Sequence, residues 1–206
     1  MSAADRLIII GAGGYGRVVA DIAVQNGYTQ IAFLDDDPNA TSIAYPILGC
    51  VSDFEQYVKD SGFVIAIGNN AVRKRITGDL IARGATLVTL VHPRATVAAD
   101  AVLERGVVVM AGGIVNPNSV IGEGTILNTA CSVDHDCRVG AFCHVSVGSH
   151  IAGGVSIGDH TMIGAGATVI NCIRICEDTV VGAGAVVVKD ICEAGTYVGL
   201  PAKRVK

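Results

Sequence analysis

The sequence predicts two parts, a small α/β domain followed by a parallel β-helix. Two observations support this order. Every sixth residue from 97 to 187 is aliphatic, whereas residues 7 to 91 alternate short apolar runs with amphipathic segments. A strict period of six fits neither one helix nor one strand, and a period sustained over this length is typical of stacked repeats that share a core. We therefore expect domains at 1–92 and 93–206.

Composition excludes several classes of protein. Half of the 206 residues are hydrophobic, 17% are charged, and 26 are glycine, which suits a core of small side chains in repetitive layers. A net charge of -4 gives no electrostatic basis for binding nucleic acid. No apolar stretch approaches the ~20 residues of a bilayer span. The seven cysteines occur without a secretion signal, so we expect a cytoplasmic protein with reduced thiols.

Local patterns predict each element of the first part. Four apolar runs bounded by turn residues predict buried strands, at 7–10, 31–34, 63–67 and 86–91. Apolar residues three and four apart predict helices over 17–26 and 71–83, and Gly27 suits the end of the first helix. Alternating strands and helices are typical of a parallel sheet.

The turn after the first strand contains a phosphate-binding pattern. Gly11, Gly13 and Gly16 satisfy G-x-G-x-x-G, and Asp35 follows at the distance expected of an acid that binds a ribose hydroxyl. This part has room for only one mononucleotide-binding half, a Rossmann-like half-domain. One half can hold a nucleoside diphosphate, so a nucleotide-linked sugar fits better than NAD(P). An NAD(P) site and a purely structural domain remain alternatives.

Glycines predict the longer repeat of the second part. Gly follows the aliphatic residue at 122, 140 and 158 and again at 164 and 182, with a spacing of eighteen in each series. Gly tolerates left-handed backbone and tight corners, so we expect this position to turn the corners of a triangular coil of three hexads, with roughly five coils in all. Three cysteines occupy an inward position for small residues, where packing is expected rather than metal binding: Cys131, Cys137 and Cys143.

His135 is the candidate for chemistry. It lies between Asp134 and Asp136. A carboxylate hydrogen-bonded to an imidazole favours the protonated ring and fixes its tautomer, which suits a general base near neutral pH. A surface His-Asp pair without function is the alternative, and the residue types do not decide between the two.

The chain resembles the hexapeptide-repeat sugar O- and N-acetyltransferases. The matching segments are 11–16, 33–36, 66–70, 126–129, His135-Asp136, 143–148 and 197–204. The most similar group acetylates the 4-amino group of nucleotide-linked 4-amino-4,6-dideoxy sugars, either the UDP-sugars of the bacillosamine pathway or GDP-perosamine. The resemblance implies a left-handed β-helix, acetyl-CoA as co-substrate, no metal, and a homotrimer with active sites between subunits.

The resemblance also implies roles for individual residues. His135 would be the general base, with Asp136 where relatives often have Glu. Acetyl-CoA would contact His144, Gly153, Ala183 and Asn128. The nucleotide sugar would contact Gly13, Gly14, Tyr15, Asp35, Asp36 and Gly68, although some relatives have His in place of Tyr15. The amine would attack the thioester directly, with the oxyanion near the N–H of Gly153.

Other functions stay open on the sequence alone. The chain could O-acetylate a sialic-type sugar, or could be an NAD(P)-dependent oxidoreductase. A zinc hydratase like the γ-class carbonic anhydrases is a third possibility, but His144 and His150 are six residues apart where that class needs five. A non-catalytic trimeric scaffold is the last. The sequence does not choose between UDP and GDP.

Overall fold

The computed structural model describes residues 6–41 and 44–206. It divides into two compact units, of which the first ends at Pro93 and the second begins at Arg94. Each unit is considered by itself.

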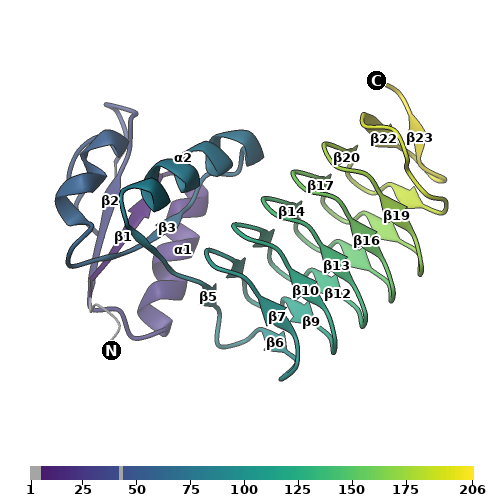
Figure 1. The fold of residues 1–206 in the computed structure, drawn as a ribbon, viewed down its shortest axis with the longest axis horizontal. Helices are drawn as coiled ribbons and strands as arrows, with labels where there is room; N and C mark the ends of the chain where they lie inside the picture. The colour runs from purple at the N-terminus through teal and green to yellow at the C-terminus, as the bar shows by residue number, and fades with distance from the viewer. Residues whose placement is uncertain (1–5, 42–43) are drawn as a thin grey trace. The chain divides into compact units, whose positions relative to one another are not determined.

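The first unit is a parallel four-stranded sheet with helices (Figure 1). Its strand order is β2-β1-β3-β4. In chain order the elements are β1 (Arg6–Ile10), α1 (Gly14–Gln25), β2 (Gln30–Leu34), the 3₁₀ helix η1 (Val51–Tyr57), β3 (Gly62–Ile65), α2 (Asn70–Ala82), β4 (Thr86–Leu87) and β5 (Leu90–Val91). The predicted elements are therefore present. The fourth predicted strand is split into β4 and β5, and η1 was not predicted.

The core of this unit lies on one face of the sheet, under η1 and α2. Alternate strand residues such as Ile8, Leu34 and Phe63 are fully buried on one face of the sheet. Phe54 of η1 and Ile76 of α2 cover this face, and the rings of Phe54 and Phe63 meet edge to face with centroids 6.4 Å apart. Because the strands are parallel, their carboxyl ends lie at one edge of the sheet, where ligands of open α/β sheets bind.

The second unit is a parallel β-solenoid of short strands in three stacks, drawn as successive rungs in Figure 1. The first stack is β6 (Thr96–Val97), β9 (Ile114–Val115), β12 (Ser132–Val133), β15 (His150–Ile151), β18 (Thr168–Val169) and β21 (Val186–Val187). The second is β7 (Val102–Leu103), β10 (Val120–Ile121), β13 (Arg138–Val139), β16 (Ser156–Ile157) and β19 (Arg174–Ile175). The third contains β8 (Val108–Val109), β11 (Ile126–Leu127), β14 (His144–Val145), β17 (Met162–Ile163), β20 (Val180–Val181), β22 (Thr196–Val198) and the antiparallel β23 (Lys203–Arg204).

The six-residue period forms the core of the solenoid. The repeat aliphatics from Val109 to Val187 are buried and stack on their counterparts one turn away, as Val133 does on Ile151. Val97 and Leu103 in the first turn are only half-buried. The first stack has six strands and so counts six turns, one more than the roughly five expected.

The predicted conformational reason for the repeat glycines is wrong. Left-handed backbone occurs two residues later in the hexad, for example at Asn118, Asp136 and Gly154. The glycines themselves are required by close approach between turns. A Cβ on Gly122 would lie 2.6 Å from the main-chain nitrogen of Ala141 in the next turn. Steric contact between stacked coils therefore selects glycine at these positions, and corner conformation does not.

Candidate active site

Three glycines leave open space at the carboxyl edge of the sheet. Gly13 caps α1 with its main chain, and no side chain accepts from the first N–H groups of the helix. A Cβ added to Gly13 or Gly68 would meet no atom within 4 Å, and one on Gly14 would meet only the tip of Arg17. Uncapped N–H groups beside unfilled space are suited to binding an anion. The fold therefore does not need these glycines, whereas close approach of a ligand would.

The other two fingerprint glycines have a structural role. A Cβ on Gly16 would overlap the carbonyl oxygen of Gly11. Gly11 itself has a φ of 103°, which favours glycine. These two residues shape the loop, and they leave its outer side to Gly13 and Gly14.

Two consecutive aspartates fix the loops around this edge. The Oδ2 of Asp35 accepts the Ala12 N–H at 2.6 Å, and its Oδ1 accepts the Asp37 N–H at 2.8 Å. The Oδ1 of Asp36 accepts the Val51 N–H at 2.8 Å. Asp35 thus braces the glycine loop from β2, and Asp36 holds the start of η1.

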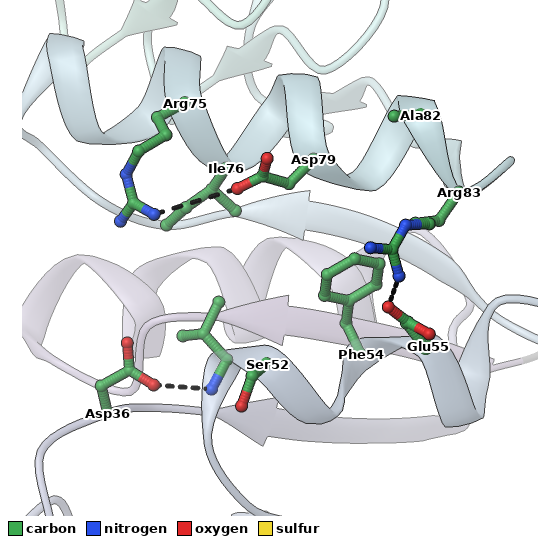
Figure 2. A pocket seen from close by; sticks show the side chains of 10 residues that line it. Asp36, Ser52, Phe54, Glu55, Arg75, Ile76, Asp79, Ala82 and Arg83 are labelled. Carbon is green, nitrogen blue, oxygen red and sulfur yellow. Dashed lines mark hydrogen bonds and ion pairs between the residues drawn. The ribbon is translucent and has the colours of Figure 1, made fainter.

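Asp36 also lines a pocket of about 560 Å³ between η1 and α2 (Figure 2). Phe54 and Ile76 contribute its apolar lining, and charged side chains surround them. Figure 2 shows the ion pairs of Arg83 with Glu55 and of Arg75 with Asp79. This pocket could not be predicted from the sequence, because one of its walls is η1, an element that was not predicted.

The phenol of Tyr15 lies in the interior of the first unit. Its hydroxyl is buried without a hydrogen-bond partner among residues 6–41 and 44–206. Burial raises the pKa of this phenol, and the nearby Arg73 charge opposes the rise. The Arg73 guanidinium donates to the carbonyls of Ile67, at 2.9 Å, and Gly68, at 3.2 Å. Any contact of Tyr15 with a phosphate would therefore use its main-chain N–H.

His135 lies outside the solenoid, at the corner between β12 and β13. Its side chain is 61% exposed, and Nδ1 lies 2.7 Å from the Oδ2 of Asp136. Its main-chain N–H donates to the Oδ1 of Asp134 at 2.8 Å. The hydrogen bond with Asp136, followed by the charge of Asp134, raises the pKa of His135. Nδ1–H facing a carboxylate leaves the lone pair of Nε2 for a proton from solvent or substrate.

The ring of His135 lies on Gly153 of the next turn. A Cβ on Gly153 would be 2.7 Å from both Cε1 and Nε2 of the ring. The neighbouring Gly154 N–H donates to the His135 carbonyl at 2.9 Å. Within the described residues the Gly153 N–H has no partner. His135, Asp136 and Gly153 therefore form one cluster, which we call the histidine corner.

The remaining predicted cofactor residues lie at another corner of the coil, between the third and first strand stacks. The Nδ2 of Asn128 and the Nε2 of His144 are 3.1 Å apart. Ala183 follows β20 at the same corner, further along the solenoid. A single chain thus does not gather all the predicted residues. It places Asn128, His144 and Ala183 at one corner and the histidine corner at the next.

A shallow groove of about 390 Å³ adjoins the histidine corner. It runs over the outer face of β9, β12, β15 and β18 and includes Asn116, Asp134 and His150. The Oγ of Ser132 and the Nδ1 of His150 are 2.9 Å apart across it. Ile114, Ile151 and Val169 also line it, so the histidine corner adjoins a wall of mixed polar and apolar side chains on which a ligand or a second chain could lie.

The three cysteines predicted to point inward, Cys131, Cys137 and Cys143, are fully buried. In the described part of the chain, no three His, Cys, Asp or Glu residues are grouped so that they could hold a metal ion. The helices of that part are too short or too polar to cross a bilayer.

Both units match known families. Residues 6–80 match the PglD N-terminal domain, and residues 136–171 match the bacterial transferase hexapeptide (six repeats). Over 108 residues the chain is 34% identical to UDP-N-acetylbacillosamine N-acetyltransferase of Bacillus subtilis (strain 168). That match covers 50% of this chain and 50% of the Bacillus protein, so it spans only about half the length of this curated relative.

Several solved structures match along nearly the whole chain. The acetyltransferase domain of PglB from Neisseria gonorrhoeae FA1090 is 40% identical with a TM-score of 0.94, over 98% of this chain and 100% of that one. The chain belongs to the hexapeptide-repeat nucleotide-amino-sugar N-acetyltransferases. A histidine-to-alanine variant of GDP-perosamine N-acetyltransferase from Caulobacter crescentus, in complex with CoA and GDP-perosamine, is 38% identical over 98% of this chain and 97% of its own, with a TM-score of 0.94.

Sequence reasoning about this acetyltransferase missed two polar side chains at the histidine corner. The Nδ2 of Asn118 donates to the Oδ1 of Asp136 at 2.5 Å, and that of Asn116 donates to the Oδ1 of Asp134 at 2.8 Å. Each asparagine precedes its aspartate by eighteen residues, one turn of the solenoid. The repeat length was available from the sequence, and applying it to the two aspartates would have found both.

Proposed function

We propose that this acetyltransferase transfers the acetyl group of acetyl-CoA to the 4-amino group of a nucleotide-linked 4-amino-4,6-dideoxy sugar. The observation that carries the proposal is the histidine corner, where an exposed imidazole is held by Asp136 and supported by Gly153. Relatives of the same fold and length are acetyltransferases, one in complex with acetyl coenzyme A and one with CoA and GDP-perosamine.

The chemistry assigned to His135 is removal of one proton. The neutral amine attacks the thioester carbonyl carbon, and the new C–N bond forms as Nε2 of His135 takes a proton from the nitrogen. The oxyanion accepts a hydrogen bond from the Gly153 N–H. Collapse of the tetrahedral intermediate breaks the C–S bond, and the CoA sulfur leaves with the proton that His135 returns. Much of the acceleration comes from holding both substrates together.

The first unit supplies the nucleotide site in this proposal. The diphosphate would lie on the uncapped N-terminus of α1, against Gly13, Gly14 and the Tyr15 N–H. Asp35 and Gly68 border the same edge, and the pocket beside Asp36 offers space for the nucleoside. The mixed polar and apolar lining of that pocket suits either uracil or guanine, so the identity of the base is left to experiment.

A homotrimer would complete the site. Acetyl-CoA contacts are proposed at Asn128, His144 and Ala183, which lie at a different corner from His135 in the same chain. Packing of solenoids side by side around a threefold axis would bring that corner of one chain to the histidine corner of its neighbour. The groove along β12 and β15 would then be covered by the second chain. The proposed location is the cytoplasm, where acetyl-CoA is available.

The test is acetyl transfer to a defined panel of acceptors. The protein is incubated with acetyl-CoA and UDP- and GDP-linked 4-amino sugars, and thiol release is followed together with the mass of the sugar product. We expect an N-acetylated product from at least one 4-amino sugar and none from the matching 4-hydroxy sugar. Transfer only to hydroxyl acceptors, or binding of NAD(H) without transfer, would contradict the proposal.

A further inference from the structure

Asn118 lies one turn of the solenoid before Asp136 and contacts its side chain. Its Nδ2 donates to the Oδ1 of Asp136, while the Oδ2 of Asp136 faces the Nδ1 of His135. Each carboxylate oxygen therefore has its own partner. The three side chains form a continuous row from Asn118 through Asp136 to His135.

We propose that Asn118 is a positioning residue for the acetyl transfer, which orients the Asp136 carboxylate and thereby the imidazole of His135. The proposal rests on the assignment of His135 as the base.

An exposed aspartate needs such a partner. The Asp136 side chain is 55% exposed, so nothing but hydrogen bonds limits rotation of its carboxylate. A bond to one oxygen at 2.5 Å from a neighbouring coil fixes the plane of the group and directs the other oxygen at the ring. The main chain of Asn118 is also held, because the Nη1 of Arg138 donates to the main-chain carbonyl of Asn118 at 3.2 Å.

Asn116 supports the main chain of His135 indirectly, through the carboxylate of Asp134. Asn116 donates to the Oδ1 of Asp134, and this oxygen also accepts the His135 N–H. The two asparagines thus secure the two carboxylates on either side of His135. Of the two, only Asn118 acts on the ring, so the test concentrates on it.

The charged groups around the pair determine how the pKa responds. Asp134, Asp136 and Arg138 face this site. The pKa of Asp136 is lowered first by the bond from His135 and then by the bond from Asn118. Loss of the Asn118 amide alone would make Asp136 a stronger base and raise the His135 pKa. If Asp136 instead lost its orientation, its hydrogen bond to the imidazole would weaken and the pKa of His135 would fall. A positioning role therefore predicts a fall.

The variant that tests this role is Asn118→Gly. Asn118 has a φ of 59°, which glycine adopts without strain, so the change removes the amide without harming the corner. Cys172→Gly is the matched control, since Cys172 is exposed, has a φ of 61°, and lies at the same corner without touching Asp136. Steady-state kinetics with acetyl-CoA and the accepted sugar, and NMR titration of the His135 ring, are measured for both.

We expect Asn118→Gly to lower kcat about tenfold with little change in either KM, and to lower the pKa of His135. Cys172→Gly should match the parent protein. An unchanged kcat, an unchanged or raised His135 pKa, or an equal loss in Cys172→Gly would each overturn the proposal. If Asn118→Gly folds poorly, Asn118→Asp keeps the size and tolerance of positive φ but repels Asp136, and the same kinetic loss is expected. Parental activity of His135→Ala would remove the base assignment alone, because the NMR titration tests the orientation of the ring independently.

Discussion

The contact between Gly153 and His135 gives a quantitative test of the histidine corner. Gly153 is buried under the imidazole and has no unusual φ, so Gly153→Ala leaves the backbone free to adopt its native conformation. The added methyl carbon would lie 2.7 Å from Cε1 and Nε2 of His135 and 3.2 Å from Nδ1. Carbon atoms in contact are ordinarily about 3.5–4.0 Å apart. The ring must therefore retreat by about 1 Å.

A displacement of this size is expected to lower kcat strongly and to change the free energy of unfolding little. Misplacing a reacting group by about 1 Å can cost about 100-fold in rate, which corresponds to about 2.7 kcal/mol in the activation barrier. The imidazole is mostly outside the solenoid and can move into solvent, so the free energy of unfolding should change little. We expect kcat to fall about 100-fold for Gly153→Ala.

The assay is thiol release from acetyl-CoA with saturating sugar, with Gly78→Ala as control. Gly78 is an exposed residue of α2, and a Cβ there would meet no atom within 4 Å. The double variant His135→Ala/Gly153→Ala separates ring displacement from loss of cofactor contact, since displacement cannot harm a missing ring. The reasoning is refuted if Gly153→Ala keeps its kcat, or if it costs the same factor with His135 absent.

Three further predictions follow from the same geometry. The hydrogen bond with Asp136 raises the pKa of His135, and the base must be deprotonated to act, so kcat/KM should rise with pH through a midpoint above that of a free imidazole. Asp136→Asn should move this midpoint to lower pH, and a midpoint insensitive to Asp136→Asn would disprove the coupling. Gly122→Ala should lower the free energy of unfolding by about 1–3 kcal/mol through collision with the next coil, measured by denaturant titration, and parental stability would contradict the steric account. Gly13→Ala should fold normally but raise KM for the nucleotide sugar, whereas Gly16→Ala should fail to fold, as thermal melting and kinetics would show; equal behaviour of the two would be inconsistent with their different surroundings.

The sequence was sufficient for the architecture because the fold repeats. Every turn must bury an aliphatic residue at each sixth position, so the same pattern recurs in each turn between Val97 and Val187. The repeat glycines were recognised because they too recur at a fixed spacing, but the steric reason for them was not predicted. A Cβ on Gly140 would collide with Asp159, nineteen residues away in the next turn, and such contact between turns cannot be seen in the local sequence.

The candidate site was predicted less completely. His135 and Asp136 are adjacent in the chain, so their pairing could be anticipated, although the competing pair with Asp134 could not be dismissed. The orientation of Asp136 by Asn118 depends on register between turns. The pocket beside Asp36 depends on η1, a short element with no strong periodic signal. Interactions between residues adjacent in the chain were thus predicted, whereas interactions between residues distant in the chain were missed.

The most direct test of the account is the turnover of His135→Ala at saturating acetyl-CoA and sugar, with the dissociation constants of both substrates measured beside it. The account predicts that kcat falls by at least about 100-fold while both dissociation constants stay close to those of the parent protein. Undiminished turnover by the variant would contradict it.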